Sequence, residues 1–421
     1  MNYLTQSGQC VSLARQPLGR GGEGQVLPVA GSPTMVAKIF HKPTRERWLK
    51  LAAMIAHPMP KANGNPLVAW PNEVLFTHET QPKFAGYLMP RITEAHPLFT
   101  YYVMSTRQKK YPGFNYRYLA RCAHNLAAAV ALAHQHGHVI GDLNESNALA
   151  DLQGIVRLLD VDSWQVVDSI GGVTYPCGVG KGEFIAPELQ GQDLSRFRRE
   201  PCHDNFALAV LIFKLINEGN HPADGVYRGR GEPPSIESRI AAGTFPYCDG
   251  SGCWLPKPFA VPFGSLHPRL QQLFIQTFQT GHSRPQMRPD ARAWQKALAQ
   301  AEKDFRVCAN NPQHFCWTGA CTWCERTALL GGLDPFPGPS LVKPQAKPRP
   351  ATVQQPATNN ECQPQPAPSW QPVWLPVPIA EIIQSIAQRS GLSPAVITAV
   401  AAGLSTLAGA AAFATLRRFL M

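Results

Sequence analysis

Apolar residues recur every three or four positions between Tyr116 and His136. This spacing places them on one face of an α-helix. The recurring positions are Leu119, Ala123, Leu126, Ala127, Val130 and Ala133. The next residue, Gly137, is of the type that most readily adopts the left-handed conformation found after helix ends. The pattern predicts a long buried helix that ends at this glycine.

Shorter patterns upstream predict strands and one more helix. Residues 34–40 form a mostly apolar run that contains a single charged side chain, Lys38. Residues 68–71 and 83–91 are further candidate strands. Residues 44–56 place apolar side chains at helical spacing. The N-terminal part is therefore predicted to be rich in β-structure, with a helix after the lysine-containing strand.

The composition adds only a little to the predictions of fold and function. The chain has 421 residues, enough for more than one domain, and its 39 Lys and Arg exceed its 28 Asp and Glu by 11. This excess offers a basic surface to phosphates, acidic proteins or anionic lipid, and generic solubility charge explains it equally well. No clear nucleic-acid signature is present. The first residues lack the features of a signal peptide, and the scattered cysteines fit reduced thiols in the cytoplasm.

Three oxygen-bearing side chains are spaced as phosphoryl transfer requires. Asn147 follows Asp142 in a short polar stretch, and Asp160 ends the apolar run 156–159. One carboxylate can orient the attacking hydroxyl, while an amide oxygen and a second carboxylate hold Mg²⁺ against the phosphates of ATP. An Asp/Asn-rich turn without catalytic function produces the same short pattern, so its meaning depends on the rest of the chain.

A glycine-rich segment near the N-terminus adds a phosphate-binding signature. It matches G-x-G-x-x-G-x-V through Gly19, Gly21, Gly24 and Val26. A dinucleotide-binding turn has similar glycines but needs an acidic residue about twenty positions later. Here the glycines are followed by Lys38 in a strand. A lone strand lysine is usually an edge residue, but behind a glycine loop it indicates contact with phosphates.

Together these stretches resemble the motifs of the protein kinase superfamily, in the order in which the family has them. Further along, residues 186–188 (Ala-Pro-Glu) resemble the end of a kinase activation segment, and Arg288 resembles the arginine that pairs with its glutamate, here Glu188. Asp204 lies at the start of an apolar helix, where the family aspartate holds the catalytic loop. Small-molecule kinases share the Asp/Asn loop but usually lack the Ala-Pro-Glu segment.

The resemblance implies an α+β, two-lobed protein kinase fold over residues 12–305. A small β-rich N-lobe would cover residues 12–92, and a larger helical C-lobe residues 93–305. The activity that it implies is transfer of the γ-phosphate of ATP to Ser/Thr hydroxyls of a protein substrate. ATP would lie under the glycine loop, with Met89 near the adenine.

The resemblance also assigns roles to individual side chains. Lys38 would contact the α- and β-phosphates, with Glu46, the one acid in the helix 44–56, as its partner. Asp142 would orient the substrate hydroxyl, and Asn147 and Asp160 would hold Mg²⁺. The predicted catalytic residues are therefore Lys38, Asp142, Asn147 and Asp160.

Three residues depart from the family pattern. Asn144 stands where the catalytic loop usually has a lysine that steadies the γ-phosphate, and Gly141 stands where many kinases have an arginine. Asp162 replaces the glycine of D-F-G, and a tight turn with a solvated carboxylate is preferred here over an extra metal contact.

An ATP-binding pseudokinase that acts as a scaffold is therefore the alternative function. The forms G-D-L-N-x-S-N and D-V-D-S resemble those of a compact group of bacterial serine/threonine-type kinases with a C-terminal zinc module.

Five soft metal ligands follow the kinase-like region: Cys308, His314, Cys316, Cys321 and Cys324. The thiolates of the C-x-x-C pair can face one ion, and Cys308 with either His314 or Cys316 completes a tetrahedron. No catalytic acid stands nearby, so the pattern predicts a closed, structural Zn²⁺ site within a knuckle over residues 306–328.

The rest of the chain is predicted to have no core of its own. Residues 329–378 are rich in Pro, Gln and Ala, which is typical of a disordered linker. A helical tail is expected over residues 379–421, where residues 392–416 carry no charge and are long enough for a membrane span. Their many Ala and Gly residues favour a packing helix equally. The expected location is the cytoplasm, either free or with the tail in the inner membrane face; a membrane-tethered adaptor that uses the linker is a third interpretation.

Overall fold

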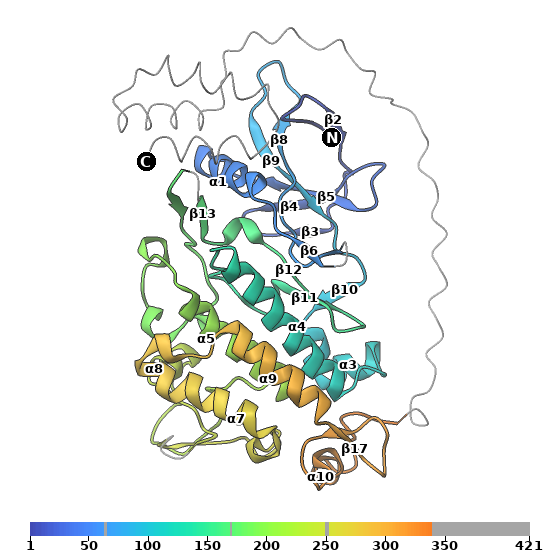
Figure 1. Ribbon diagram of the computed structural model, residues 1–421, viewed down its shortest axis with the longest axis vertical. Helices are drawn as coiled ribbons and strands as arrows, with labels where there is room; N and C mark the ends of the chain where they lie inside the picture. Colours follow the sequence, from blue (N-terminus) through green and yellow to red (C-terminus); the bar gives the residue numbers. More distant parts are fainter. Residues whose placement is uncertain (63–64, 169–170, 249–251, 339–421) are drawn as a thin grey trace, which may run out of the picture. The chain divides into compact units, whose positions relative to one another are not determined.

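The N-terminal part is built on one antiparallel sheet of seven strands in the computed structural model (Figure 1). The structure describes residues 1–62, 65–168, 171–248 and 252–338. In chain order the strands of the sheet are β1 (Asn2–Thr5), β2 (Cys10–Ser12), β3 (Gly19–Arg20), β4 (Gly24–Pro28), β5 (Met35–Phe40), β8 (Glu73–Thr77) and β9 (Phe84–Pro90). Their order across the sheet is β2-β1-β8-β9-β5-β4-β3. Strands β1 and β2 extend this sheet beyond the predicted start of the domain at residue 12.

The register of the sheet places the predicted phosphate-binding lysine. Lys38 in β5 lies opposite Val26 of β4 and Tyr87 of β9. Because side chains alternate along a strand, Lys38 shares a face with Val36 and Phe40. Both of these apolar side chains belong to the main core. The lysine is therefore 7% exposed and faces the interior of the protein.

Helix α1 (Arg45–Ala56) packs against this sheet, as the apolar spacing predicted. Thr44 begins the helix, and its side chain accepts a hydrogen bond from the Arg47 backbone N–H at 3.2 Å. The helix contacts β8, β9 and the 3₁₀ helix η1 (Val161–Ser163). Its buried residues are Lys50, Leu51 and Met54.

The C-terminal part is mainly helical. Helix α4 (Tyr116–Gln135) is the predicted long helix, and Gly137 follows it with a φ of 76°. It packs against α5 (Pro201–Ile216) and α9 (Ala291–Lys303), as Figure 1 shows. Its apolar face and the almost wholly buried α5 form the centre of the core.

The remaining elements are short. The other α-helices are α2 (Phe99–Tyr102), α3 (Met104–Lys110), α6 (Ile236–Ala241), α7 (Pro268–Ile275), α8 (Gly281–Ser283) and α10 (Thr322–Leu329). Strands β10 (Ala95–Pro97), β11 (Ala148–Asp151) and β12 (Val156–Leu158) form a three-stranded sheet. The other strands are β6 (Lys61–Ala62), β7 (Asn65–Pro66), β13 (Val166–Asp168), β14 (Val173–Tyr175), β15 (Val226–Tyr227), β16 (Trp254–Leu255), β17 (Arg306–Val307) and β18 (Phe315–Cys316).

Most of the predicted linker and all of the predicted helical tail lie outside the described residues, which end at 338. The expected membrane span at residues 392–416 belongs to this part. Within the described ranges, no helix has both the length and the apolar character that crossing a membrane requires.

Candidate active site and candidate metal centre

The loop between α4 and β11 is held in place by a buried aspartate of α5. The Asp204 carboxylate accepts hydrogen bonds from the backbone N–H groups of Ile140 at 2.7 Å and Gly141 at 2.8 Å. It also pairs with the His134 Nε2 at 2.9 Å. Such charge-assisted bonds are among the stronger hydrogen bonds in proteins. The loop that carries Asp142 is thus fixed to the centre of the C-lobe, in the way that the family resemblance implied.

Two amides hold the Asp142 carboxylate. The Asn144 Nδ2 donates to Asp142 Oδ1 at 3.0 Å, and the Asn147 Nδ2 donates to Asp142 Oδ2 at 3.1 Å. Burial raises the pKa of Asp142, while these amide donors act in the opposite direction. The Asn144 Oδ1 also accepts from the backbone N–H of Ser146 at 2.9 Å. Asn144 therefore braces the loop, although it cannot supply the charge of a lysine.

Lys38 reaches two carboxylates that follow β12. Its Nζ donates to Asp160 Oδ1 at 2.5 Å, and to the two oxygens of Asp162 at 2.7 and 2.9 Å. Burial lowers the pKa of Lys38, but Asp162 and Asp160 outweigh it and leave that pKa raised. Burial raises the pKa of Asp160, against the lowering effect of Lys38. The side chain of Asp162 is only 4% exposed.

These contacts correct two predictions. Glu46 was expected to pair with Lys38, but it is exposed in the first turn of α1, and the carboxylate partners of Lys38 are Asp160 and Asp162. Asp162 was expected to be solvated, but its carboxylate is buried against Lys38 and also accepts a hydrogen bond from the Tyr87 hydroxyl at 2.8 Å. Both predictions failed because the sequence does not show which acid packs against the face of β5 that carries the lysine.

The backbone at Asp160 is unusual. Its φ of 55° and ψ of 39° lie in the left-handed region, which residues other than glycine rarely occupy. Ser163 holds this turn, because its hydroxyl donates to the Asp160 carbonyl at 2.7 Å and its backbone N–H does so at 3.1 Å. Strain of this kind occurs at functional sites where the surroundings enforce it. The turn lets Asp160 and Asp162 face the same ammonium group.

The glycine loop is the β3–β4 hairpin. A Cβ atom at Gly24 would lie 2.4 Å from the Ile39 carbonyl oxygen, so only glycine fits there, whereas Gly19 and Gly21 have open space around them. Open backbone of this kind suits close approach of a phosphate. Val26 lies in β4 of this hairpin, opposite Gly19. Met89, the predicted adenine contact, is buried in the core, and that contact remains a prediction.

An arginine that the sequence analysis did not single out connects the catalytic loop to the segment after it. Arg199 is 2% exposed, and its guanidinium donates to the Val179 carbonyl at 3.1 Å and weakly to the Gly141 carbonyl at 3.5 Å. A buried side chain from a distant segment thus lies beside the position where the family usually has its loop arginine. Its only sequence signal is a basic run, Arg196 to Arg199, which resembles ordinary surface charge.

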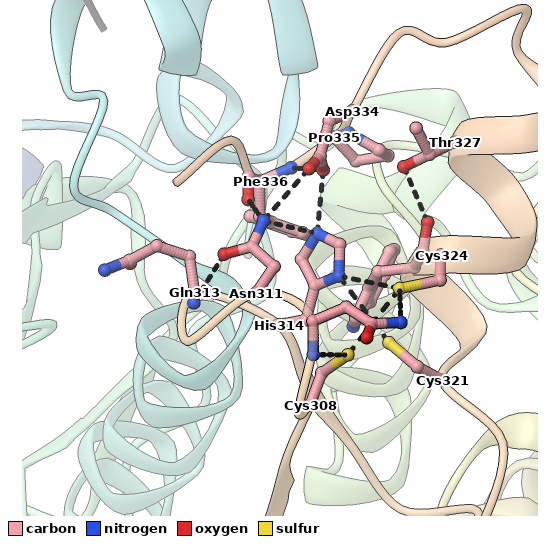
Figure 2. Close-up of polar contacts among 12 residues, drawn as sticks. Cys308, Asn311, Gln313, His314, Cys321, Cys324, Thr327, Asp334, Pro335 and Phe336 are labelled. Carbon is pink, nitrogen blue, oxygen red and sulfur yellow. Dashed lines mark hydrogen bonds and ion pairs between the residues drawn. The ribbon is translucent and has the colours of Figure 1, made fainter. Parts of the chain in front are cut away.

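Four of the predicted metal ligands converge on one point. The ligand atoms of Cys308, His314, Cys321 and Cys324 all lie within 4.8 Å of one another. Figure 2 shows the three sulfurs and the His314 ring turned toward each other. The Cys308 and Cys324 sulfurs are 3.6 Å apart, and the His314 Nδ1 lies 3.5 Å from Cys321 Sγ and 3.6 Å from Cys324 Sγ. Cys316 does not belong to this set: its thiol lies 3.7 Å from two backbone carbonyls, to which it donates.

An acid outside the predicted knuckle orients the histidine. The His314 Nε2 donates to Asp334 Oδ1 at 2.8 Å, on the side of the ring away from the sulfurs (Figure 2). This bond leaves the Nδ1 lone pair directed at the cysteines. The sequence signal for Asp334 is weak, because it lies in the stretch predicted as linker.

The cysteine-containing segment is docked on the C-lobe through buried charges. The Glu218 carboxylate accepts from Arg107 of α3 at 2.8 Å and from Arg326 of α10 at 2.6 Å. Arg107 also donates to the Pro335 carbonyl at 3.1 Å. All three charged side chains are at most 7% exposed. The segment from β17 to residue 336 is therefore part of the C-lobe packing and shares its core through Trp323 and Phe336.

The β-rich N-lobe, the helical C-lobe and the Lys38, Asp142, Asn147 and Asp160 arrangement between them define a protein kinase fold. Comparison with known proteins agrees. The chain is 33% identical over 329 residues to the protein kinase YegI of Escherichia coli O157:H7, covering 76% of this chain and 49% of that protein. The protein of the same name from Escherichia coli strain K12 is 32% identical over 332 residues, covering 77% and 50%. The chain thus spans about half the length of these curated relatives.

A solved structure described as the ROP18 kinase domain in complex with AMP-PNP and sucrose matches with a TM-score of 0.47 at 17% identity, covering 72% of this chain and 84% of that chain. No family model matches the chain. The chain belongs to the protein kinase superfamily, as its sequence relatives and the geometry of the site both indicate.

Proposed function

We propose that this protein is an ATP-dependent protein kinase that transfers the γ-phosphate to Ser/Thr hydroxyls of a protein. The observation that carries the proposal is the joint placement of the four predicted catalytic residues. Lys38 contacts Asp160 at 2.5 Å, and Asn147 contacts Asp142 at 3.1 Å. The two curated relatives are named protein kinases, which supports the reaction class. The choice of Ser/Thr over Tyr rests on the resemblance of the catalytic loop to the bacterial serine/threonine-type group.

The residues fit Mg²⁺ as well as nucleotide. Asn147 Oδ1 and Asp160 Oδ2 each have no hydrogen bond within the described part of the chain, and Asp160 keeps 36% of its side chain exposed. Oxygen ligands of these two types are those that Mg²⁺ prefers. When bound, the ion would neutralise charge on the phosphates.

The chain's own residues would do the positioning. Lys38 would bind the α- and β-phosphates, because the sheet register places it opposite Val26, in the strand that follows the glycine hairpin. Asp142 would exchange one amide contact for the hydroxyl of the substrate, orient it and accept its proton. Because Asp204 fixes the backbone of this loop, the carboxylate is held in place before the substrate arrives.

The pseudokinase alternative depends on Asn144. An asparagine in place of the loop lysine removes a cation from the γ-phosphate position. Asn144 braces the loop instead, and the contacts of Lys38 with Asp160 and of Asn147 with Asp142 support a catalytic arrangement. These contacts support catalysis over a scaffold that only binds ATP.

Radiolabelled ATP tests the proposal. Purified full-length protein with Mg²⁺ is expected to label itself or a generic Ser/Thr substrate. The Asp142→Asn variant should bind ATP but lose roughly a hundredfold or more of the transfer rate, as is typical when a proton-accepting group is removed. Asp193→Asn, a change at an exposed aspartate, is the matched control. Equal labelling by wild type and Asp142→Asn would refute the assignment, and acid hydrolysis of the labelled product would separate phosphoserine and phosphothreonine from phosphotyrosine.

We further propose that Cys308, His314, Cys321 and Cys324 bind a structural Zn²⁺. Tetrahedral zinc with Zn–S of about 2.3 Å and Zn–N of about 2.0 Å requires S···S separations near 3.8 Å and S···N separations near 3.5 Å. Three separations in this group, of 3.5 to 3.6 Å, lie near those values, and all four ligand atoms lie within 4.8 Å of one another. Four protein ligands leave no open position, so the role would be structural.

Metal analysis tests the zinc site independently of catalysis. Purified protein is expected to contain about one equivalent of Zn²⁺ per chain, and Cys321→Ser and His314→Ala should lose it. Cys316→Ser is the control, because Cys316 lies outside the group of four converging ligand residues. If Cys316→Ser lost zinc while His314→Ala kept it, the ligand set would be wrong. If a protein folded through residue 336 contained no metal, the site itself would be refuted.

A further inference from the structure

Helix α1 offers Lys38 no carboxylate. The helix contains a single acidic residue, Glu46, which is exposed. The polar residue on its buried side is a lysine instead: Lys50 is 7% exposed. Within the described ranges, Lys50 has no ion-pair or hydrogen-bond partner. A buried cation on this face makes α1 unsuited to holding a second cation.

The missing carboxylate comes from the turn after β12. Asp162 contacts the Lys38 Nζ through both oxygens, at 2.7 and 2.9 Å. Its side chain is 4% exposed, so water screens this pair little. The Tyr87 hydroxyl, from the strand next to Lys38, donates to the same carboxylate at 2.8 Å and fixes its orientation. Asp162 is therefore bound on two sides by the strands of the N-lobe sheet.

The position of Asp162 also affects Asp160. The two carboxylates are separated by one residue and approach the same ammonium group because Asp160 has its left-handed backbone. Asp162 neutralises Lys38 from the interior side, while the Asp160 side chain is 36% exposed and its Oδ2 has no hydrogen bond within the described residues. If the charge on Asp162 were absent, Asp160 would be the one carboxylate among the described residues left to balance the buried lysine, and it would be held away from other partners.

We propose that Asp162 is the positioning carboxylate for Lys38, in place of an acid on helix α1, and that it leaves Asp160 available for Mg²⁺. This inference rests on the kinase activity proposed above. Both carboxylates that contact Lys38 lie in one short segment, residues 160–162. Helix α1 supplies neither of these carboxylates, so a displacement of α1 cannot withdraw one from Lys38.

The Asp162→Asn variant tests the inference, because it removes the charge and keeps the shape and an acceptor for Tyr87. Because the variant lacks the charge that holds the Lys38 ammonium group, the KM and the Kd for ATP are expected to rise roughly tenfold or more. The Mg²⁺ concentration needed for half-maximal activity should also rise. A purely structural role for Asp162 would lower the thermal unfolding temperature without this selective change in Mg²⁺ requirement. Glu46→Gln is the matched control and should leave both constants within twofold of wild type.

A double-mutant cycle makes the test specific. If Asp162 acts through Lys38, adding Asp162→Asn to Lys38→Met should cause no further loss of ATP affinity. Three results would overturn the inference: ATP affinity of Asp162→Asn within twofold of wild type, full additivity in the cycle, or a tenfold loss in Glu46→Gln. The Glu46→Gln result tests the inference even if the Asp162→Asn variant fails to fold. Calorimetric binding of ATP with Mg²⁺ separates the two proposals, because wild type that binds ATP through Asp162 but transfers no phosphate refutes the kinase activity alone.

Discussion

The Arg288 guanidinium holds the Glu188 carboxylate through two parallel hydrogen bonds of 2.7 Å each. The arginine side chain is fully buried and also donates to the Cys202 carbonyl at 3.1 Å, whereas the glutamate side chain is 27% exposed. This pair connects the end of the activation segment to the turn before α9. The family resemblance predicted it from the Ala-Pro-Glu and Arg-Pro motifs, and the structure places the two side chains in contact.

Removing one partner of this pair should destabilise the C-lobe. Glu188→Gln leaves a buried guanidinium without a counter-charge, which costs about 3–5 kcal/mol in fully buried pairs. Because water reaches the Glu188 side of the pair, the expected loss in the free energy of unfolding is smaller, about 2 kcal/mol. Denaturant titration measures it, with Glu232→Gln, an exposed glutamate, as the control. A change below about 0.5 kcal/mol, within the usual range for surface substitutions, would contradict the prediction.

The carboxylate behind the zinc site should tune metal affinity. Asp334 fixes the His314 ring through the 2.8 Å bond to Nε2. Loss of such an outer partner typically costs about 10- to 100-fold in metal affinity. Asp334→Asn is therefore expected to release Zn²⁺ to a competing chelator at correspondingly lower chelator concentration. Glu325→Gln, at an exposed position of α10, should behave as wild type. Equal chelator resistance of the two variants would show that Asp334 does not support the site.

Activity should not depend on phosphorylation of the activation segment. Gly141 offers no cation to a phosphate, and Arg199 already joins the loop to Val179 through backbone carbonyls. Ser163 is buried and its hydroxyl is bound to Asp160, so Ser169 and Thr174 are the residues to test. Phosphatase treatment and the Ser169→Ala/Thr174→Ala variant are expected to leave the transfer rate within about threefold, whereas Arg199→Ala should lower it. A tenfold drop in the double variant, about 1.4 kcal/mol in barrier, would show that a phosphate switch exists.

His221 should make the C-lobe sensitive to acid. Its Nε2 donates to the Glu183 carbonyl at 2.9 Å and its Nδ1 accepts from the Ala223 N–H at 3.0 Å, an arrangement that fits only the neutral ring. Burial lowers the pKa of His221 from about 6.5 to about 4. At a pH between about 4 and 6.5, His221 is protonated in the unfolded chain but neutral in the folded protein. Stability is therefore fully present above pH 6.5 and falls as the pH drops toward 4, by about 3 kcal/mol from this group.

Denaturant titrations between pH 7.5 and pH 4.5 measure this dependence. The His221→Gln variant, which retains a donor and an acceptor but does not titrate, should show a shallower loss of stability over the same range. Parallel slopes for wild type and variant would mean that other groups carry the acid sensitivity.

Much of the architecture was predictable because it depends on local periods. The spacing of Leu119, Ala123, Leu126 and Val130 predicted α4, and Gly137 marked its end. The strand that carries Lys38 was predictable from its apolar run. The short loop from Asp142 to Asn147 needs few residues to bring its side chains together, so its hydrogen bonds follow from the motif itself.

The choice among competing partners was not predictable. Cys308 was expected to have either His314 or Cys316 beside it, and both are close in sequence. The structure groups His314 with the three cysteines because Asp334, from beyond the predicted knuckle, orients its ring. The spacing of the cysteines and the histidine does not reveal that Asp334 contacts the histidine ring.

The sequence by itself determined which elements form and which chemical groups the site contains: a glycine hairpin, a strand lysine, an Asp/Asn loop and a cluster of soft ligands. Only the tertiary structure decided that Asp162, and not Glu46, meets Lys38, and that Arg199 reaches Gly141. The physical reason is that helix and strand periods are set by neighbouring residues along the chain. The pairing of buried charges depends instead on which side chains are packed together after the whole core forms, and a buried cation accepts whichever carboxylate the packing brings within reach.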